Sequence, residues 1–286
     1  ITARASPRSC SAANRNSRDA DPVRAPASDI SFVDLGDMRR EYRWIPPVAA
    51  GRPALVFLHE GLGRVAMWKG FPDRIAAATG CGALVYSRAG YGRSSPVAVP
   101  RPLRYMHDEG LDVLPRLLRA LTLDRVVLIG HSDGGSIALV HGGSGRAPET
   151  AGIVTLAAHV FNEDLCVASI RAAKDAYVAG ELRRRLERFH GDNVDCAFWG
   201  WNGAWLDPGF REWNLEEYLP SIRVPVLAIQ GADDPYGSAA QYEAIRAGCG
   251  GPVEVLVLDR CGHSPHLAQP EATAVAVTRF ISALNS

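Results

Sequence analysis

The stretch Leu128-Ile129-Gly130-His131-Ser132-Asp133-Gly134-Gly135 joins an apolar run to a serine that is flanked by small residues. It fits the pattern G-x-S-x-G and lies between a strand-like segment, 125–129, and a helix-like segment, 134–141. A sharp turn between a strand and a helix favours glycine on both sides of the serine, because a side chain there would collide with backbone. The pattern therefore predicts that Ser132 is a nucleophile on a strained turn, at a helix N-terminus that favours developing negative charge.

Strand-like and helix-like segments alternate along most of the chain. Short continuous apolar runs, typical of strands buried on both faces, occur at 54–58, 83–86, 125–129, 152–156, 224–229 and 253–258. Two earlier strands are expected within 29–44, and helices are expected at 67–79, 101–121, 134–141, 241–247 and 271–284. This order predicts an α/β fold with a mostly parallel sheet of about eight strands, covered by helices on both faces.

Residues 161–220 break this alternation, because they contain charged, helix-like pieces and no clear buried strand. We therefore predict a core formed by residues 29–160 and 221–286, with residues 161–220 inserted after the sixth strand as a helical cap. Three tryptophans of this segment are candidates for binding an apolar or aromatic substrate: Trp199, Trp201 and Trp205. The alternative is that these rings only pack the inside of the cap.

Composition limits the partners and the location that we expect. Basic and acidic residues number 31 each, so the chain lacks the basic excess that favours nucleic acid. No apolar run approaches the ~20 residues of a membrane span. Residues 1–28 are rich in Arg, Ser, Ala and Pro and are predicted to be disordered. The six cysteines form no C-x-x-C pair, which is typical of free thiols in a cytoplasmic protein.

A serine nucleophile needs a base, and the base needs an acid that orients it. In chains with this type of turn the order is serine, acid, histidine. His263 follows the last apolar run and is expected at the same edge of the sheet as Ser132. Asp233 and Asp234 follow the run at 224–229, and turn chemistry alone suits either of them as the acid.

The negative oxygen formed in acyl transfer requires backbone N–H groups that converge on it. One donor is expected from Asp133, the residue after the serine, and the other from Gly61 in the loop His59-Glu60-Gly61-Leu62-Gly63. His159 follows the sixth strand and is a candidate to line the substrate pocket, with packing as the alternative. His190 ends a charged, helix-like piece and is expected to be solvated.

From about residue 30 to the C-terminus, these motifs together resemble the α/β-hydrolase fold superfamily. The resemblance is carried by the 59–63 loop, the segment 87–94 (SRAGYGRS), the turn at Ser132, Gly231-x-x-Asp234, and Gly262-His263. The chain looks most like the capped bacterial branch of carboxylesterases and hydrolases of ring-cleavage products. The resemblance implies the α/β-hydrolase fold with a cap, and it favours Asp234, three residues after a glycine, as the acid.

Two positions depart from the pattern of that branch. Glu60 stands where a glycine usually follows the histidine, so its carboxylate either enters the substrate pocket or turns outward, for example toward an arginine. Asp133 stands where the ring-cleavage hydrolases usually carry methionine, which favours ester cleavage over carbon–carbon cleavage.

We therefore expect a serine hydrolase that cleaves a carboxylic ester of a small, apolar or aromatic substrate through an acyl-enzyme. Ser132, His263 and Asp234 would form its triad, with no metal and no cofactor. A carbon–carbon bond hydrolase is the alternative among enzymes, and a ligand-binding receptor with a vestigial triad is the alternative from another class. The sequence leaves the natural substrate and the oligomeric state open.

Overall fold

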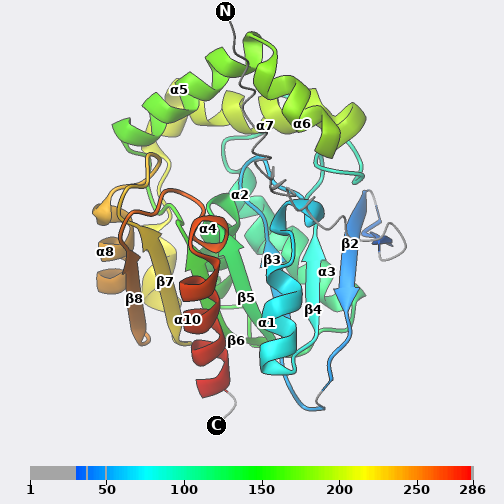
Figure 1. The fold of residues 1–286 in the computed structure, drawn as a ribbon, viewed down its shortest axis with the longest axis vertical. Coiled ribbons are helices and arrows are strands. Elements are labelled where there is room, and N and C mark those ends of the chain that lie inside the picture. The colour runs from blue at the N-terminus through cyan, green and yellow to red at the C-terminus, as the bar shows by residue number, and fades with distance from the viewer. Residues whose placement is uncertain (1–29, 37, 49, 285–286) are drawn as a thin grey trace, which may run out of the picture.

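A single eight-stranded sheet organises the described residues, 30–36, 38–48 and 50–284, in a computed structural model of the chain (Figure 1). Its strands are β1 Ile30–Asp34, β2 Arg39–Ile45, β3 Ala54–Leu58, β4 Ala83–Tyr86, β5 Val126–His131, β6 Thr150–Leu156, β7 Val226–Gly231 and β8 Val253–Leu258. Their order is β1-β2-β4-β3-β5-β6-β7-β8, antiparallel at β1 and β2 and parallel from β4 to β8. The predicted α/β fold is confirmed.

Helices cover both faces of the sheet. Helices α1 (Phe71–Thr79) and α10 (Pro270–Ala283) pack together on one face, and α3 (Leu114–Ala120), α4 (Asp133–Gly142) and α8 (Ala239–Gly248) lie on the other. Successive residues of a strand point to opposite faces, so Val127 and Leu128 enter different hydrophobic cores. Because both faces are covered, the parallel strands are continuous apolar runs.

The helix expected at 101–121 is not continuous. It divides into α2 (Tyr105–Asp108), a π-helical turn (Glu109–Val113) and α3. Pro115 has no N–H to continue the regular ladder, which is consistent with the altered hydrogen bonding one turn earlier. Gly110 also lies against α4, where an added Cβ would be 2.9 Å from the Ile137 carbonyl oxygen. The interruption therefore coincides with a close contact between the two segments.

Three helices between β6 and β7 lie above the carboxyl ends of the strands (Figure 1). They are α5 (Asp164–Val178), α6 (Glu181–His190) and α7 (Val194–Leu206), and they fall in the segment predicted as a cap. The rings of Tyr177 and Phe198 stack between α5 and α7 with centroids 3.6 Å apart. We call these three helices the cap. The remaining helical elements are α9 (Pro265–Ala268) and short 3-10 segments at Val65–Trp68, Gly191–Asn193, Pro208–Glu212 and Glu216–Ser221.

The N-terminal segment, the cysteines and the helix lengths bear on the remaining predictions. The segment 1–28, expected to be disordered, lies outside the described residues. Five cysteines within the described ranges are free thiols: Cys81, Cys166, Cys196, Cys249 and Cys261. None of the helices formed by the described residues has the length and apolar character needed to cross a bilayer.

Candidate active site

Ser132 occupies the sharp turn between β5 and α4. Its backbone has a φ of 51°, and its N–H donates to the Leu156 carbonyl oxygen at 2.8 Å. A Cβ on Gly130 would lie 2.2 Å from the Gly134 carbonyl oxygen, and a Cβ on Gly134 would lie 2.0 Å from that of Leu58. Such contacts are closer than carbon and oxygen allow, so the turn requires glycine on both sides of the serine. The strained conformation presents Ser132 at the rim of the sheet.

The loop after β8 brings His263 to this serine. Its Nε2 lies 2.9 Å from Ser132 Oγ, and its Nδ1 lies 2.9 Å from both carboxylate oxygens of Asp234. An ionised carboxylate only accepts hydrogen bonds, so Nδ1 carries the proton and Nε2 is left to accept from the serine hydroxyl. This is the tautomer that a general base requires.

The two adjacent aspartates have different surroundings. Asp233 is exposed, whereas Asp234 is buried and accepts hydrogen bonds from the Gln230 side chain at 2.6 Å and the Tyr236 N–H at 2.8 Å. A Cβ on Gly231 would lie 2.2 Å from the Cys261 carbonyl oxygen, so this glycine lets the loop that carries His263 approach β7. The structure therefore places Asp234, and not Asp233, against the imidazole.

Asp234 is held in its ionised form. Burial opposes ionisation, but the hydrogen bond and charge of His263 and the N–H of Tyr236 outweigh it and lower the pKa of the Asp234 carboxyl below its ordinary value. A carboxylate in this position stabilises an imidazolium on His263 when the ring takes up a proton.

Two backbone N–H groups lie in segments that meet beside Ser132. Gly61 belongs to the loop after β3, and Asp133 is the first residue of α4. The segments are in contact, because a Cβ on Gly134 would lie 2.8 Å from the His59 carbonyl oxygen. Neither the Gly61 N–H nor the Asp133 N–H donates a hydrogen bond to another of the described residues. Neither group is therefore occupied by a hydrogen bond within this part of the chain, and their role as oxyanion donors stays a prediction.

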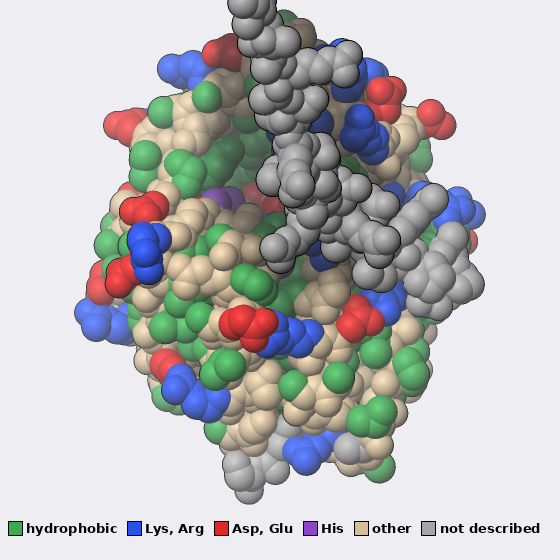
Figure 2. Space-filling model, in the orientation of Figure 1, with side chains coloured by type: hydrophobic (Ala, Val, Ile, Leu, Met, Phe, Trp, Pro, Cys, Tyr) green, Lys and Arg blue, Asp and Glu red, His purple; other side chains and the backbone are tan. Residues whose placement is uncertain are grey.

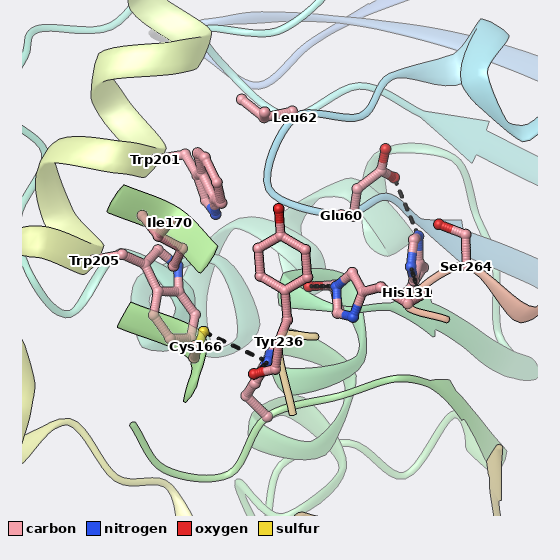
Figure 3. A pocket seen from close by; sticks show the side chains of 12 residues that line it. Glu60, Leu62, His131, Cys166, Ile170, Trp201, Trp205, Tyr236 and Ser264 are labelled. Carbon is pink, nitrogen blue, oxygen red and sulfur yellow. Dashed lines mark hydrogen bonds and ion pairs between the residues drawn. The ribbon is translucent and has the colours of Figure 1, made fainter. Parts of the chain in front are cut away.

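A cavity of about 240 Å³ opens beside Ser132 and His263. The core contributes its polar side, and the cap contributes Cys166, Ile170, Trp201 and Trp205. Figure 2 shows a hollow between the cap and the core in which hydrophobic, histidine and acidic side chains are visible. The ring of Tyr236 stands between Trp201 and Glu60 in this cavity (Figure 3). A predominantly apolar wall close to a few polar groups is the usual character of a small-molecule site.

Trp199 is a correction to the predicted substrate-binding residues. It does not line the cavity, and its ring packs edge-on against Tyr177 and Phe198 inside the cap. Residues Trp201 and Trp205 are four apart and share one face of α7, whereas Trp199 is rotated from Trp201 by about 200°. Trp199 therefore packs inside the cap, which was the alternative interpretation of these tryptophans.

Glu60 lines the cavity and pairs with a histidine rather than an arginine. Its Oε2 lies 3.4 Å from His131 Nδ1, the contact drawn in Figure 3. Burial opposes the charge, yet the hydrogen bond and charge of His131 hold the pKa of the Glu60 carboxyl well below its ordinary range. His131 Nε2 donates to the carbonyl oxygen of His263 at 2.7 Å. Glu60 therefore lines the cavity and contacts the residue that precedes Ser132.

His159 also lines the cavity, and its Nε2 donates to the Tyr236 carbonyl oxygen at 3.1 Å. Burial, with a smaller contribution from the charge of His263, lowers the pKa of His159 to about 4. The ring is therefore neutral at pH 7. It adds a polar but uncharged group to the wall next to His263.

His190 is buried, which corrects the expectation that it is solvated. Its Nδ1 accepts from the Gly92 N–H at 3.1 Å and its Nε2 donates to the Leu62 carbonyl oxygen at 3.0 Å. Burial lowers the pKa of this imidazole to about 4. The charged residues of α6 suggest a solvated helix. Its last residue, His190, is nevertheless buried, because the helix ends against two loops of the core.

Sequence reasoning missed several residues that shape the site, above all Tyr236 and the buried Arg88. Tyr236 lies two residues after Asp234, and its ring centroid is 4.6 Å from that of His263. Arg88 is fully buried, and its guanidinium donates to the His59 carbonyl oxygen at 2.8 Å. Arg88 lies two residues after β4 in the segment 87–94, a position that points to the edge of the sheet near Ser132 but not to the acceptors of the guanidinium.

Several known proteins are similar to this chain in sequence or in fold. A protein of Serratia proteamaculans (strain 568) named 2-succinyl-6-hydroxy-2,4-cyclohexadiene-1-carboxylate synthase is 24% identical over 255 residues, which cover 81% of this chain and 94% of that protein. A solved hydrolase from Pseudomonas aeruginosa PA01 superposes with a TM-score of 0.68 at 24% identity, covering 90% of this chain and 99% of the other. A thermophilic esterase from Thermogutta terrifontis gives a TM-score of 0.65 at 20% identity, covering 87% and 95%.

The solved structures share the fold at low identity, and the family assignment comes from the sequence. A family model described as "Alpha/beta hydrolase family" matches residues 55–276, which include the turn at Ser132 and both loops that carry Asp234 and His263. The match spans more than half of the chain. The chain therefore belongs to the alpha/beta hydrolase family.

Proposed function

We propose that this hydrolase cleaves a carboxylic ester of a small, largely apolar or aromatic substrate through an acyl-enzyme on Ser132. The observation that carries the proposal is the position of His263, 2.9 Å from Ser132 Oγ on one side and 2.9 Å from the Asp234 carboxylate on the other. A hydroxyl with this partner becomes a nucleophile at neutral pH.

The reaction proceeds in two halves. His263 Nε2 takes the hydroxyl proton as Ser132 Oγ bonds to the ester carbonyl carbon, and the carbonyl oxygen gains negative charge. The N–H groups of Gly61 and Asp133 stabilise that oxygen, and loss of one such donor typically slows turnover by about 10²–10³-fold. The imidazolium then gives its proton to the departing alcohol, which leaves the acyl group on Ser132. Water, deprotonated by His263, releases the acid and restores the serine.

The cavity supports a small apolar substrate. Its volume of about 240 Å³ and the apolar side chains from the cap suit a compact acyl or alcohol group. An esterase is among the solved structures that share the fold, so ester cleavage is chemistry that this fold accommodates. The proposed steps use only groups of the chain and water.

A panel of p-nitrophenyl esters of increasing acyl length, combined with a fluorophosphonate probe, tests the proposal. We expect turnover of short or aromatic esters and covalent labelling that disappears in Ser132→Ala. Consumption of a coloured vinylogous diketone with little ester turnover would instead favour carbon–carbon hydrolysis. Thermal stabilisation by ligands without any turnover or labelling would favour a binding protein and contradict the acyl-enzyme.

A further inference from the structure

Arg88 follows β4 and is buried between the two segments that carry the proposed oxyanion donors. Its Nη2 donates to the Glu60 carbonyl oxygen at 3.1 Å and lies 3.4 Å from Asp133 Oδ2. Its Nη1 donates to the His59 carbonyl oxygen at 2.8 Å. One guanidinium therefore contacts the loop of Gly61 and the residue after the nucleophile at the same time.

The contact at Glu60 acts on the N–H of Gly61 through the peptide that joins the two residues. In a trans peptide the carbonyl oxygen and the N–H point in opposite directions, and among the described residues only Val99–Pro100 is cis. The Glu60 carbonyl oxygen accepts from Arg88, from His59 Nδ1 at 2.7 Å and from the Gly63 N–H at 3.1 Å. Of these three donors, Arg88 alone also reaches Asp133, so it relates the orientation of this peptide and its Gly61 N–H to the start of α4.

The ring of Trp201 closes the loop from the cap side. A Cβ on Gly61 would lie 2.2 Å from Trp201 Cδ1, so the indole packs directly on the Gly61 backbone. The peptide before Gly61 is thus held between a guanidinium and an indole, and rotation of its plane is opposed from both directions.

The other end of the arginine is anchored as firmly. The Asp133 carboxylate is fully buried and accepts from the Tyr105 hydroxyl at 2.6 Å, and that hydroxyl accepts from Trp205 Nε1 at 3.1 Å. Burial raises the pKa of the Asp133 carboxyl, and the charge of Arg88 acts against this rise. The side chain of Asp133 thus ties the start of α4 to Arg88, while its N–H stays available to the reacting oxygen.

We propose that Arg88 is a positioning residue that fixes the Gly61 and Asp133 N–H groups relative to each other without touching the substrate. The inference rests on the proposed ester hydrolysis at Ser132, for which these two groups form the oxyanion hole. A planar fork with several donors suits this task, because it reaches three acceptors in two segments, the loop after β3 and the start of α4. A lysine ammonium keeps the charge but lacks the fork.

The test compares Arg88→Lys with Arg101→Lys. Arg101 is also a buried arginine, but its Nη2 donates to the Ala89 carbonyl oxygen, whereas the guanidinium of Arg88 donates directly to His59, Glu60 and Asp133. We expect kcat of Arg88→Lys on a p-nitrophenyl ester to fall by about 10–100-fold, with KM within about threefold, since a displaced donor acts mainly in the transition state. The affinity for a trifluoromethyl ketone, which forms an oxyanion on Ser132, should fall in proportion. Arg101→Lys should retain kcat within about twofold.

A second variant tests the inference if Arg88→Lys does not fold. Arg88→Met combined with Asp133→Asn removes both buried charges together, and we expect the same loss of kcat. Unchanged kcat in either folded variant, even with reduced stability, would show that Arg88 is only structural and would overturn the inference.

A crystal structure of Arg88→Lys gives a readout that does not depend on activity. We expect the Glu60–Gly61 peptide to be displaced relative to Ser132. A peptide plane that superposes on the wild-type plane would overturn the positioning role. If wild-type protein neither turns over esters nor reacts with the fluorophosphonate, the proposed function fails, while this comparison still decides whether Arg88 positions the loop.

Discussion

In the core, Ser132 and His263 stand on loops held by close backbone contacts, whereas in the cap Trp201 and Trp205 stand on one face of a helix. A Cβ at Gly130, Gly134 or Gly231 would overlap a neighbouring backbone atom, so the positions of the reacting groups are fixed by sterics. The cap side chains reach the cavity through ordinary packing of apolar surface. From this difference we expect the core to determine the reaction and the cap to determine which substrates fit.

Asp234→Asn should give the largest effect, because an amide can donate as well as accept, so it no longer fixes the tautomer of His263 and no longer stabilises an imidazolium. We expect kcat to fall by about 10³–10⁴-fold with the fold retained. Asp233→Asn is the matched control, since Asp233 is exposed and adjacent in sequence. Ester turnover and urea unfolding measure both variants. Near-normal turnover in Asp234→Asn would assign the role of the acid to another carboxylate.

Trp201→Ala tests the role of the cap. We expect kcat/KM for aromatic esters to fall by about 10–100-fold, because the variant removes an apolar wall of the cavity that also packs on Gly61. Trp199→Ala, on another face of the same helix, should lower stability and leave kcat/KM within about twofold. Equal kinetic losses in the two variants would break the distinction between the two faces of α7.

Glu60→Gln should have a smaller effect that depends on the charge of the substrate. The carboxylate lines the cavity, and its ion-pair partner is His131 rather than a member of the proposed triad. We expect kcat/KM for a neutral ester to change by less than about fivefold. That for an ester with a cationic alcohol should fall further, because a half-buried carboxylate attracts a nearby cation. Equal losses for two esters of the same shape would show that Glu60 acts only by supporting His131.

His190→Gln should leave turnover at pH 8 unchanged and alter the pH dependence of stability. The folded chain holds the pKa of His190 at about 4, below its ordinary value of 6.5. Between these values the unfolded chain binds a proton that the folded chain does not, so the free energy of unfolding falls as the pH is lowered from 6.5 to 4. One proton corresponds to about 1.4 kcal/mol per pH unit.

Urea unfolding of wild type and His190→Gln at pH 4.5, 5.5 and 6.5 measures this slope. The variant should lose less stability per pH unit than wild type, because glutamine does not titrate and can still accept and donate at the loops near Gly92 and Leu62. If the free energy of unfolding depends on pH with the same slope in both proteins, protonation of His190 does not disturb the contact between the cap and the core.

The sheet and the tight turn that carries Ser132 could be predicted from the sequence, because both depend on local patterns. Apolar runs mark strands covered on two faces, and the small residues around Ser132 mark a turn too tight for side chains. His263 could be placed at the same edge because parallel strands end there together. The choice between Asp233 and Asp234 needed family resemblance, since the contact of Gly231 with the Cys261 carbonyl is not visible in sequence.

What could not be predicted depends on contacts between distant segments. The period of α7 separates Trp199 from Trp201, but only the docking of the helix shows which face meets the cavity. The sequence predicts that His190 is solvated, because its hydrogen-bond partners lie in two distant loops of the core. Arg88 carries no local signal for its three acceptors, because these come from segments before and after it in the chain.

The buried pair of Arg88 and Asp133 constrains how relatives of this chain can diverge. Loss of either partner alone leaves an isolated charge in the interior, which costs about 3–5 kcal/mol. That is a large part of the stability of an ordinary domain, so a substitution at one of the two positions is poorly tolerated without a substitution at the other. We therefore expect positions 88 and 133 to change together wherever either of them changes.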